Sequence, residues 1–217
     1  MHVEMTAKTL RWLLSFTDTD LTNNRGFQNI ILTKIIDKFY IVATDGHAAI
    51  FCQVEPQNPI LNLDKNLCVF FSKKDYAVLK NITDNVVCII DFDRHEWRTL
   101  GGISYRCDQI RDCNIDFQNW LQFNFTSSEE MEDKDKYQHI LDLKVLSKFC
   151  LNKDKKLIIY PVNKRTLLVK IPDELKMFGF ISKIRDDTCT ISQEFEEIIE
   201  SFEQTVKLEL KEKLNGK

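Results

Sequence analysis

One pattern of secondary structure is expected in three copies along this chain of 217 residues. In its full form the pattern is a short strand, an amphipathic helix and three further strands, with apolar strands divided by turns rich in Asp, Asn or Gly. The first copy comprises helix 5–16 and strands 27–36, 39–43 and 48–54. The second comprises strand 67–71, helix 72–82 and strands 86–92, 96–100 and 103–107. The third comprises strand 139–141, helix 142–151 and strands 156–160, 166–171 and 178–184. The pattern predicts an α+β fold of repeated β-α-β-β-β half-units, about one and a half two-unit domains.

The sequence divides into four regions. Residues 1–126 would form one complete domain, 127–136 an acidic linker, 137–187 a half-domain, and 188–217 a C-terminal amphipathic helix. The linker reads SSEEMEDKDK, which is typical of a solvated loop. The C-terminal helix would begin at a capping box, Thr190–Gln193, and carry an apolar stripe from Phe195 to Val206. That stripe would pack either on this chain, where it could cover an exposed sheet edge, or on a partner.

The composition is that of a globular protein without a membrane segment. Hydrophobic residues make up 43% and charged residues 29% of the chain, and the formal net charge is −3. No apolar run approaches the roughly 20 residues that span a bilayer, and the first residues lack the pattern of a signal peptide. We therefore expect a cytoplasmic protein that does not contact a membrane. The whole-chain charge does not predict nucleic-acid binding, although one local basic face would be compatible with it.

The sequence contains no recognisable catalytic or metal-binding motif. None of the seven cysteines forms a Cys-x-x-Cys pair, which favours buried free thiols. Asp45 and His47, and His95 beside Asp91 and Asp93, could share acid–base work or bind a metal, but their spacing fits no known template. The chain also lacks a phosphate-binding glycine loop and a nucleophile elbow. We expect no enzymatic activity, no catalytic residue, no metal and no cofactor.

The sharpest local signal is a hairpin within Ile41–Ile50, which reads IVATDGHAAI. Two apolar β-type runs flank Asp45-Gly46, and glycine tolerates the positive φ that a tight turn requires. Asp45 is therefore most simply explained as a turn residue.

Set among the half-units, this string resembles the corresponding hairpin of the bacterial β sliding clamp, the processivity factor of replicative DNA polymerase. Further segments resemble the same family: Asn29–Leu32 after Arg25, Phe117–Trp120 for the family's F-P-[DN]-[YW], and Phe178–Arg185 for its final strand. The resemblance covers roughly residues 5–186, with 1–126 similar to the middle domain and 137–186 similar to the second half of the last domain. It implies a DNA-clamp fold, truncated or divergent. A standard member has three domains and forms a six-domain ring, so closing a ring here would need a higher oligomer or another partner for the unpaired half-unit.

The resemblance also implies a groove that binds short apolar peptides of polymerases and other client proteins. The matching positions are Thr44, Gly46, His47, Ala48, Ala49, Gln122, Phe123, Phe180, Ile181 and Ser182. Several depart from the family pattern: Ala48-Ala49 replaces Arg-Leu, Gln118 replaces a proline, Gln122-Phe123 replaces Arg-Val, and Ser182–Arg185 replaces M-P-M-R. The groove would either be kept with altered specificity or be filled by Phe123 and Phe180.

In the family, helix Lys and Arg side chains face double-stranded DNA and contact its phosphates without reading sequence. The candidates in this chain are Lys8, Arg11, Lys73, Lys74, Lys80, Lys144 and Lys148, although surface helices carry lysines in any case. Two functions follow as hypotheses. The chain would be a clamp-like protein, as a homo-oligomer, that tethers or regulates a DNA replication enzyme; alternatively, it would be a ring-less adaptor or inhibitor of host replication or transcription, encoded by a phage or mobile element.

Overall fold

The computed structural model describes residues 1–17, 27, 29–59, 63, 65–107, 115–117, 119–121, 143–150, 157–163, 166–171 and 176–182. The chain divides into two compact units, residues 1–184 and 185–217, and every described residue lies in the first. The expected linker 127–136, the expected strand 139–141 and the expected helix in 188–217 lie outside the described residues.

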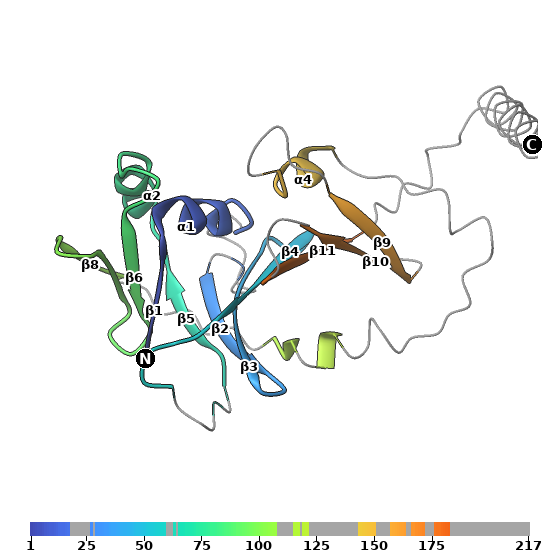
Figure 1. Ribbon diagram of the computed structural model, residues 1–217, viewed down its shortest axis with the longest axis horizontal. Helices are drawn as coiled ribbons and strands as arrows, with labels where there is room; N and C mark the ends of the chain where they lie inside the picture. The colour runs from blue at the N-terminus through green and yellow to red at the C-terminus, as the bar shows by residue number, and fades with distance from the viewer. Residues whose placement is uncertain are drawn as a thin grey trace, which may run out of the picture. The chain divides into compact units, whose positions relative to one another are not determined.

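The predicted half-units are present (Figure 1). The first consists of β1 (His2–Thr6), α1 (Ala7–Leu14), β2 (Asn29–Ile35), β3 (Lys38–Thr44) and β4 (Ala48–Val54). The second consists of β5 (Leu67–Phe70), α2 (Lys73–Lys80), β6 (Val87–Asp91), β7 (Glu96–Thr99) and β8 (Ser104–Arg106). The described part of the third consists of α4 (Leu143–Ser147), β9 (Ile158–Asn163), β10 (Thr166–Lys170) and β11 (Met177–Ser182).

The strands of the described residues form two antiparallel sheets. One has four strands in the order β1-β6-β7-β8, and the other has seven in the order β5-β2-β3-β4-β11-β10-β9. The first and second half-units exchange their leading strands, because β1 pairs with β6 while β5 pairs with β2. The third half-unit joins the longer sheet through β11, which pairs with β4. These three pairings join strands that are far apart in the sequence, so local sequence signals do not reveal them.

The start of the chain differs from the prediction. The expected helix 5–16 is shorter, and residues His2–Thr6 form a strand instead. His2–Thr6 pairs along its whole length with β6, so tertiary pairing decides its conformation. Thr6 then caps α1, because its side-chain oxygen accepts a hydrogen bond from the Thr9 N–H at 3.2 Å. The predicted cap Ser72 is confirmed, and it forms a reciprocal capping box with Asp75.

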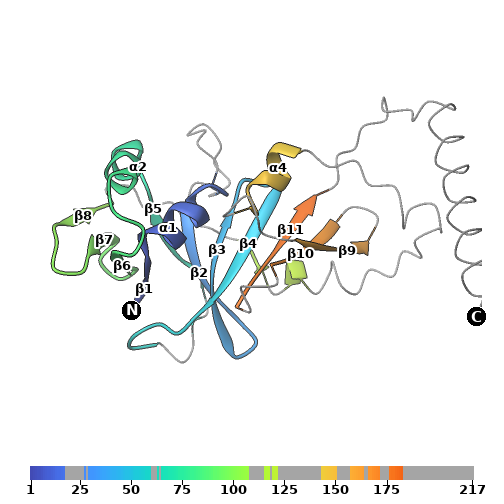
Figure 2. The same ribbon diagram turned by 45° about the horizontal axis from the view of Figure 1, so that its top comes forward.

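The seven-stranded sheet has two apolar faces. One face packs against α1 and α4, with Leu10, Phe16 and Phe149 meeting Ile41 and Ile50. The opposite face carries Val42, Phe51 and Phe180 and is covered by residues 115–121, the segment that includes Phe117 and Trp120. Successive strand residues point to opposite faces, so Ile41 and Val42 belong to different clusters. Figure 2 shows α1 between α2 and α4.

Candidate functional site

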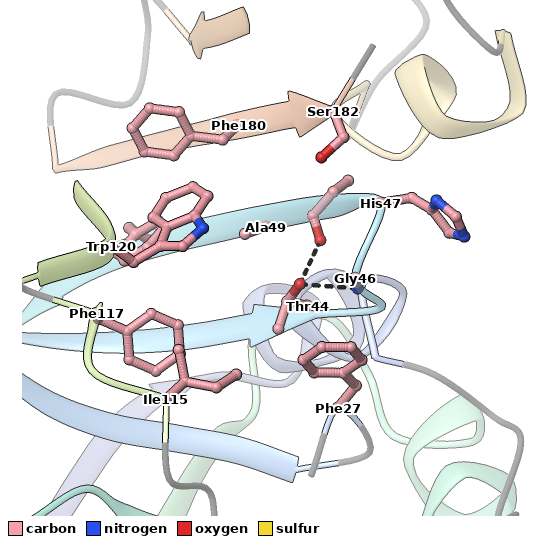
Figure 3. Close-up of a pocket in the computed structure, with 12 residues that line it drawn as sticks. Phe27, Thr44, Gly46, His47, Ala49, Ile115, Phe117, Trp120, Phe180 and Ser182 are labelled. Atoms are coloured by element: carbon pink, nitrogen blue, oxygen red, sulfur yellow. Dashed lines mark hydrogen bonds between the residues drawn. The ribbon is translucent and has the colours of Figure 1, made fainter. Parts of the chain in front are cut away.

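The hairpin between β3 and β4 is held by its own polar side chains. Gly46 has φ +89, the left-handed conformation that glycine adopts without strain. The Asp45 Oδ1 atom accepts the backbone N–H groups of His47 and Ala48, each at 2.8 Å. The Thr44 hydroxyl donates to the Ala48 carbonyl at 2.8 Å and accepts the Gly46 N–H at 3.0 Å (Figure 3). These bonds fix the turn and leave the His47 ring exposed.

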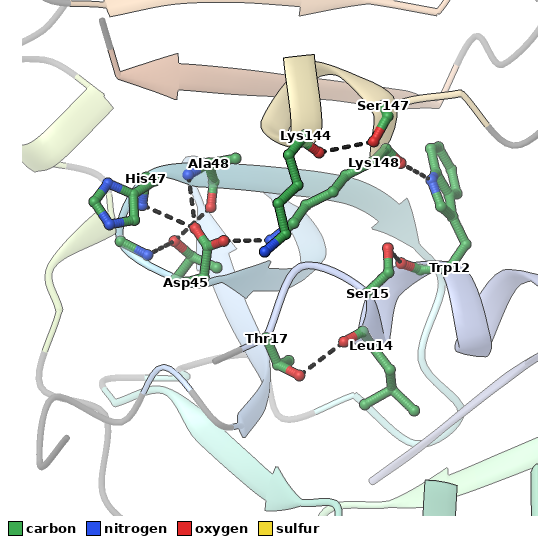
Figure 4. Close-up of polar contacts among 12 residues, drawn as sticks. Trp12, Leu14, Ser15, Thr17, Asp45, His47, Ala48, Lys144, Ser147 and Lys148 are labelled. Atoms are coloured by element: carbon green, nitrogen blue, oxygen red, sulfur yellow. Dashed lines mark hydrogen bonds and ion pairs between the residues drawn. The ribbon is translucent and has the colours of Figure 1, made fainter. Parts of the chain in front are cut away.

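The other oxygen of Asp45 connects this hairpin to the third half-unit (Figure 4). Lys148, directly after α4, donates its ammonium to Asp45 Oδ2 and forms an ion pair in which both side chains are mostly buried. Burial alone would raise the pKa of Asp45. The hydrogen bonds from Lys148 and from the Ala48 and His47 N–H groups, together with the lysine charge, outweigh that effect and hold the pKa below its usual range. The Trp12 indole N–H also donates to the Lys148 carbonyl at 2.6 Å, so α1 holds the same residue.

Strand β11 continues the sheet beyond β4 and brings a second set of side chains beside the hairpin. Ala49 lies opposite Phe180, and the Ser182 N–H donates to the His47 carbonyl at 2.8 Å. The junction is closely packed on the helical face. A Cβ atom on Gly179 would lie 2.1 Å from the Phe149 ring and 2.7 Å from the Ala49 carbonyl oxygen. Only glycine fits at this position without a shift of its neighbours.

The segment 115–121 forms the third wall. Asp116 caps a helical turn there, since its carboxylate accepts the Asn119 N–H at 2.9 Å. Trp120 lies edge-on to Phe180 with ring centroids 5.1 Å apart and stacks on Phe51 at 6.3 Å. Phe117 meets Phe51 edge-on at 5.8 Å. Such ring pairs add to the burial energy, so they anchor the segment against the sheet.

Between the three walls lies a hollow of about 260 Å³. Most of its surface is apolar, and the polar groups of Thr44, His47 and Ser182 lie toward one end (Figure 3). We call it the hairpin groove. Its lining consists of Phe27, Thr44, Gly46, His47, Ala48, Ala49, Phe51, Ile115, Phe117, Trp120, Phe180 and Ser182.

Most of the described residues expected at the groove line it, and one does not. The structure brings together Thr44, Gly46, His47, Ala48, Ala49, Phe180 and Ser182. Ile181 belongs instead to the cluster on the helical face, because neighbouring residues of β11 alternate between the two faces. Gln122 and Phe123 lie outside the described residues. Sequence reasoning did not assign Phe27, Phe51, Ile115, Phe117 and Trp120 to the lining.

The basic residues of the helices fall into two groups. Arg11 and Lys148 are engaged within the chain: Arg11 donates to the carbonyls of Leu79 and Ile82 at 2.7 and 2.8 Å and pairs with Asp84, while Lys148 pairs with Asp45. Lys73, Lys74, Lys80 and Lys144 are exposed, and Lys8 is half-buried. Arg11 thus caps the end of α2 and holds α1 beside it, a structural role that its sequence position does not reveal.

No three His, Cys, Asp or Glu residues in the described part of the chain are grouped so as to hold a metal ion. No helix in that part of the chain is long and apolar enough to cross a membrane.

Comparison by sequence and by structure gave different results. No protein-family model matches the chain, and no curated protein is similar to it in sequence. Solved structures of bacterial sliding clamps nevertheless share its fold. The DNA polymerase III β subunit of Borrelia burgdorferi, in complex with a natural product, matches with a TM-score of 0.54 and 13% identity over 85% of this chain and 64% of its own.

Two further clamps match to a similar extent. The β subunit of Bartonella birtlesii gives a TM-score of 0.53 at 7% identity, over 90% of this chain and 66% of its own. The β clamp of Helicobacter pylori, bound to a DNA ligase peptide, gives 0.50 at 12% identity, over 89% and 69%. The chain thus spans about two thirds of the length of these clamps. The protein has a DNA-clamp fold, which confirms the predicted α+β architecture and the resemblance at the level of the fold.

Proposed function

We propose that the protein is a non-catalytic, sliding-clamp-like protein that holds or regulates a DNA replication enzyme by binding a short peptide of that enzyme in the hairpin groove. The observation that carries this proposal is the apolar hollow between the β3–β4 hairpin, β11 and the segment 115–121. The clamp of Helicobacter pylori, which shares the fold, is itself a peptide-binding protein, since it was solved with a DNA ligase peptide.

The groove suits the anchoring side chains of a peptide better than a large ligand. Its volume of about 260 Å³ lies below the roughly 300–1,000 Å³ typical of small-molecule sites. Ala48 and Ala49 contribute small side chains to its lining, which leaves room for an anchor, and the aromatic rings of Phe117, Trp120 and Phe180 offer apolar surfaces for it. The exposed side chains of His47 and Ser182 can bond the polar backbone of a bound peptide.

The peptide function is tested by filling the groove. The Ala49→Trp variant places an indole in the hollow, and we expect its affinity for a fluorescently labelled DNA ligase peptide to fall at least about tenfold. Ala77→Trp is the matched control, because Ala77 is exposed on α2, and it should bind as the parent protein does. Fluorescence anisotropy measures affinity, and thermal unfolding checks that both variants fold. Equal affinities for Ala49→Trp and the parent protein would show that the peptide does not use the groove.

We further propose that the helical face contacts double-stranded DNA without sequence preference. The candidates for this role are the exposed Lys73, Lys74, Lys80 and Lys144 and the half-buried Lys8. Replacing Lys73 and Lys74 by Glu should weaken duplex binding at low salt and flatten its salt dependence by about one unit of slope per lost phosphate contact. Lys38→Glu, an exposed change on the β2–β3 hairpin, is the control and should leave binding unchanged.

The engagement of Arg11 and Lys148 within the chain favours a second candidate, a clamp-fold adaptor that binds peptides without encircling DNA. The two candidates share the groove and differ in the DNA step. The adaptor is supported if the parent protein does not bind duplex DNA in low salt, or if the Lys73→Glu/Lys74→Glu variant binds it as well as the parent does. Loss of duplex binding in that variant supports the DNA-contacting clamp.

A further inference from the structure

The first two half-units show how one half-unit completes another. Strand β1 of the first pairs with β6 of the second over His2–Thr6, and β5 of the second pairs with β2 of the first over Leu67–Phe70. In each half-unit, the strand directly after the helix therefore has two neighbours: its own next strand, and the leading strand of the other half-unit. The exchange is reciprocal, which is the arrangement of two like parts related by a two-fold axis.

Strand β9 is the corresponding strand of the third half-unit. It pairs with β10 on one side and lies at the end of the seven-stranded sheet, with no second neighbour among the described residues. The strand pairings show which residues of β9 and β2 correspond. Ile158 and Ile31 each pair with the residue four positions after the first paired residue of the next strand, and Tyr160 and Thr33 each pair with the residue two positions after it. Ile31 and Thr33 are 0% and 5% exposed, whereas Ile158 and Tyr160 are 39% and 46% exposed.

This difference in exposure agrees with the absence of a second neighbour of β9 among the described residues. An edge strand that exposes apolar side chains invites pairing with another chain. The one residue of β9 that cannot donate a backbone hydrogen bond is Pro161, which stands at the position of Lys34 in β2. Strand β5 pairs with Asn29–Leu32 and does not reach Lys34, so the proline leaves the corresponding ladder on β9 intact.

We propose that two copies of this chain dimerise through their third half-units, each adding a strand to the free edge of the other's β9 and together forming one complete two-unit domain. A second copy is the fitting occupant because half-units pair with half-units in this fold, and the third half-unit has no mate among the described residues. The strand added to β9 would come from the partner's residues before α4, where the sequence predicts a strand at 139–141. This proposal goes beyond peptide binding and does not depend on it.

The test is the mass of the intact chain in solution, measured by light scattering behind size-exclusion chromatography. A monomer has a mass of 25.6 kDa, and we expect about twice that value at a protein concentration of about 10 μM. The paired substitutions Ile158→Lys and Tyr160→Asp put charges on the edge and should halve the mass. Leu100→Lys with Ile103→Lys is the matched control, since these residues are 68% and 73% exposed beside β8, and it should remain a dimer.

Three outcomes overturn the proposal: a monomeric parent protein, a charged β9 edge that leaves the mass unchanged, or a control variant that dissociates. A monomer would mean that no second copy covers the edge of β9. Hydrogen exchange on the unmodified protein gives a second measurement in case the charged variant does not fold. The amides of Ile158 and Ile159, at the positions of Ile31 and Leu32 where β5 pairs, should become protected as concentration rises from below to above the dimer dissociation constant, while those of β3 should not change.

Discussion

Lys148, just after α4, forms a mostly buried ion pair with Asp45 in the turn between β3 and β4. The two residues lie 103 positions apart in the sequence, and the pair connects the first half-unit to the third. Because Asp45 also accepts two backbone N–H groups of its own turn, one carboxylate serves both the hairpin and the junction.

The first prediction concerns the pH dependence of this pair. The pKa of Asp45 is lowered in the folded protein, so the carboxylate stabilises the fold above its unfolded pKa of about 3.9, and the contribution is lost as pH falls through the lower folded value. Asp45→Asn should reduce the free energy of unfolding by about 1–3 kcal/mol at pH 7 and flatten its decline below about pH 4. Urea unfolding from pH 3 to 7 measures this. Asp37→Asn, at an exposed turn, is the control for removing one carboxylate, and an equal effect there would contradict the assignment.

The second prediction concerns Gly179 at the β4–β11 junction. Gly179→Ala should destabilise the protein by about 1–3 kcal/mol, because the added methyl group meets the Phe149 ring and the Ala49 carbonyl. Combining it with Phe149→Leu should recover part of this loss, since the smaller side chain removes one of the two clashes. A double-mutant cycle by chemical denaturation measures the coupling, and strict additivity would show that Phe149 does not restrict position 179.

The third prediction is a stabilising change. Ile36 is 75% exposed and has φ 57, a conformation that is strained for a β-branched residue. Ile36→Asn should raise the free energy of unfolding by about 1 kcal/mol, since asparagine tolerates this turn conformation. Ile103→Asn replaces a residue that is 73% exposed and is not among those with positive φ, so it should change stability by less than about 0.5 kcal/mol.

The fourth prediction concerns Trp120, which contacts both Phe51 and Phe180 at the groove. Trp120→Ala removes an aromatic wall and should weaken binding of the labelled peptide by about 30-fold, the loss typical of a central aromatic residue. Tyr105→Ala removes a ring that is stacked on Trp97, away from the groove, and should leave the affinity unchanged. Isothermal titration calorimetry distinguishes the two, and equal affinities would exclude Trp120 from the peptide site.

Much of the fold could be predicted from local sequence patterns. Alternating apolar residues and Asp-Gly or Ser capping signals predicted the meander around Asp45 and the start of α2 at Ser72. The strand His2–Thr6 was missed because its conformation depends on pairing with β6, about 85 residues away in sequence. The pairing of β4 with β11 could not be predicted for the same reason, because the sequence of a strand does not identify which distant strand it pairs with.

The site divides in the same way. The hairpin and the β11 residues Phe180 and Ser182 were predicted from a resemblance in sequence, and the two-residue period of a strand could have excluded Ile181. Phe117 and Trp120 belong to a recognisable sequence motif, but their position in the groove wall depends on the helical turn capped by Asp116. Nothing local to Arg11 or Lys148 indicates that each finds an acidic partner in another half-unit.

The pairing of Ala49 with Phe180 has a thermodynamic consequence. These two groove residues belong to different half-units and meet only while β4 and β11 remain paired. A peptide that touches both therefore binds the paired state and not the separated one. Separation of β4 from β11 lowers the affinity for the peptide by some factor. By linkage, bound peptide lowers the equilibrium constant for that separation by the same factor. A peptide bound in the groove would therefore stabilise the junction between the first and third half-units.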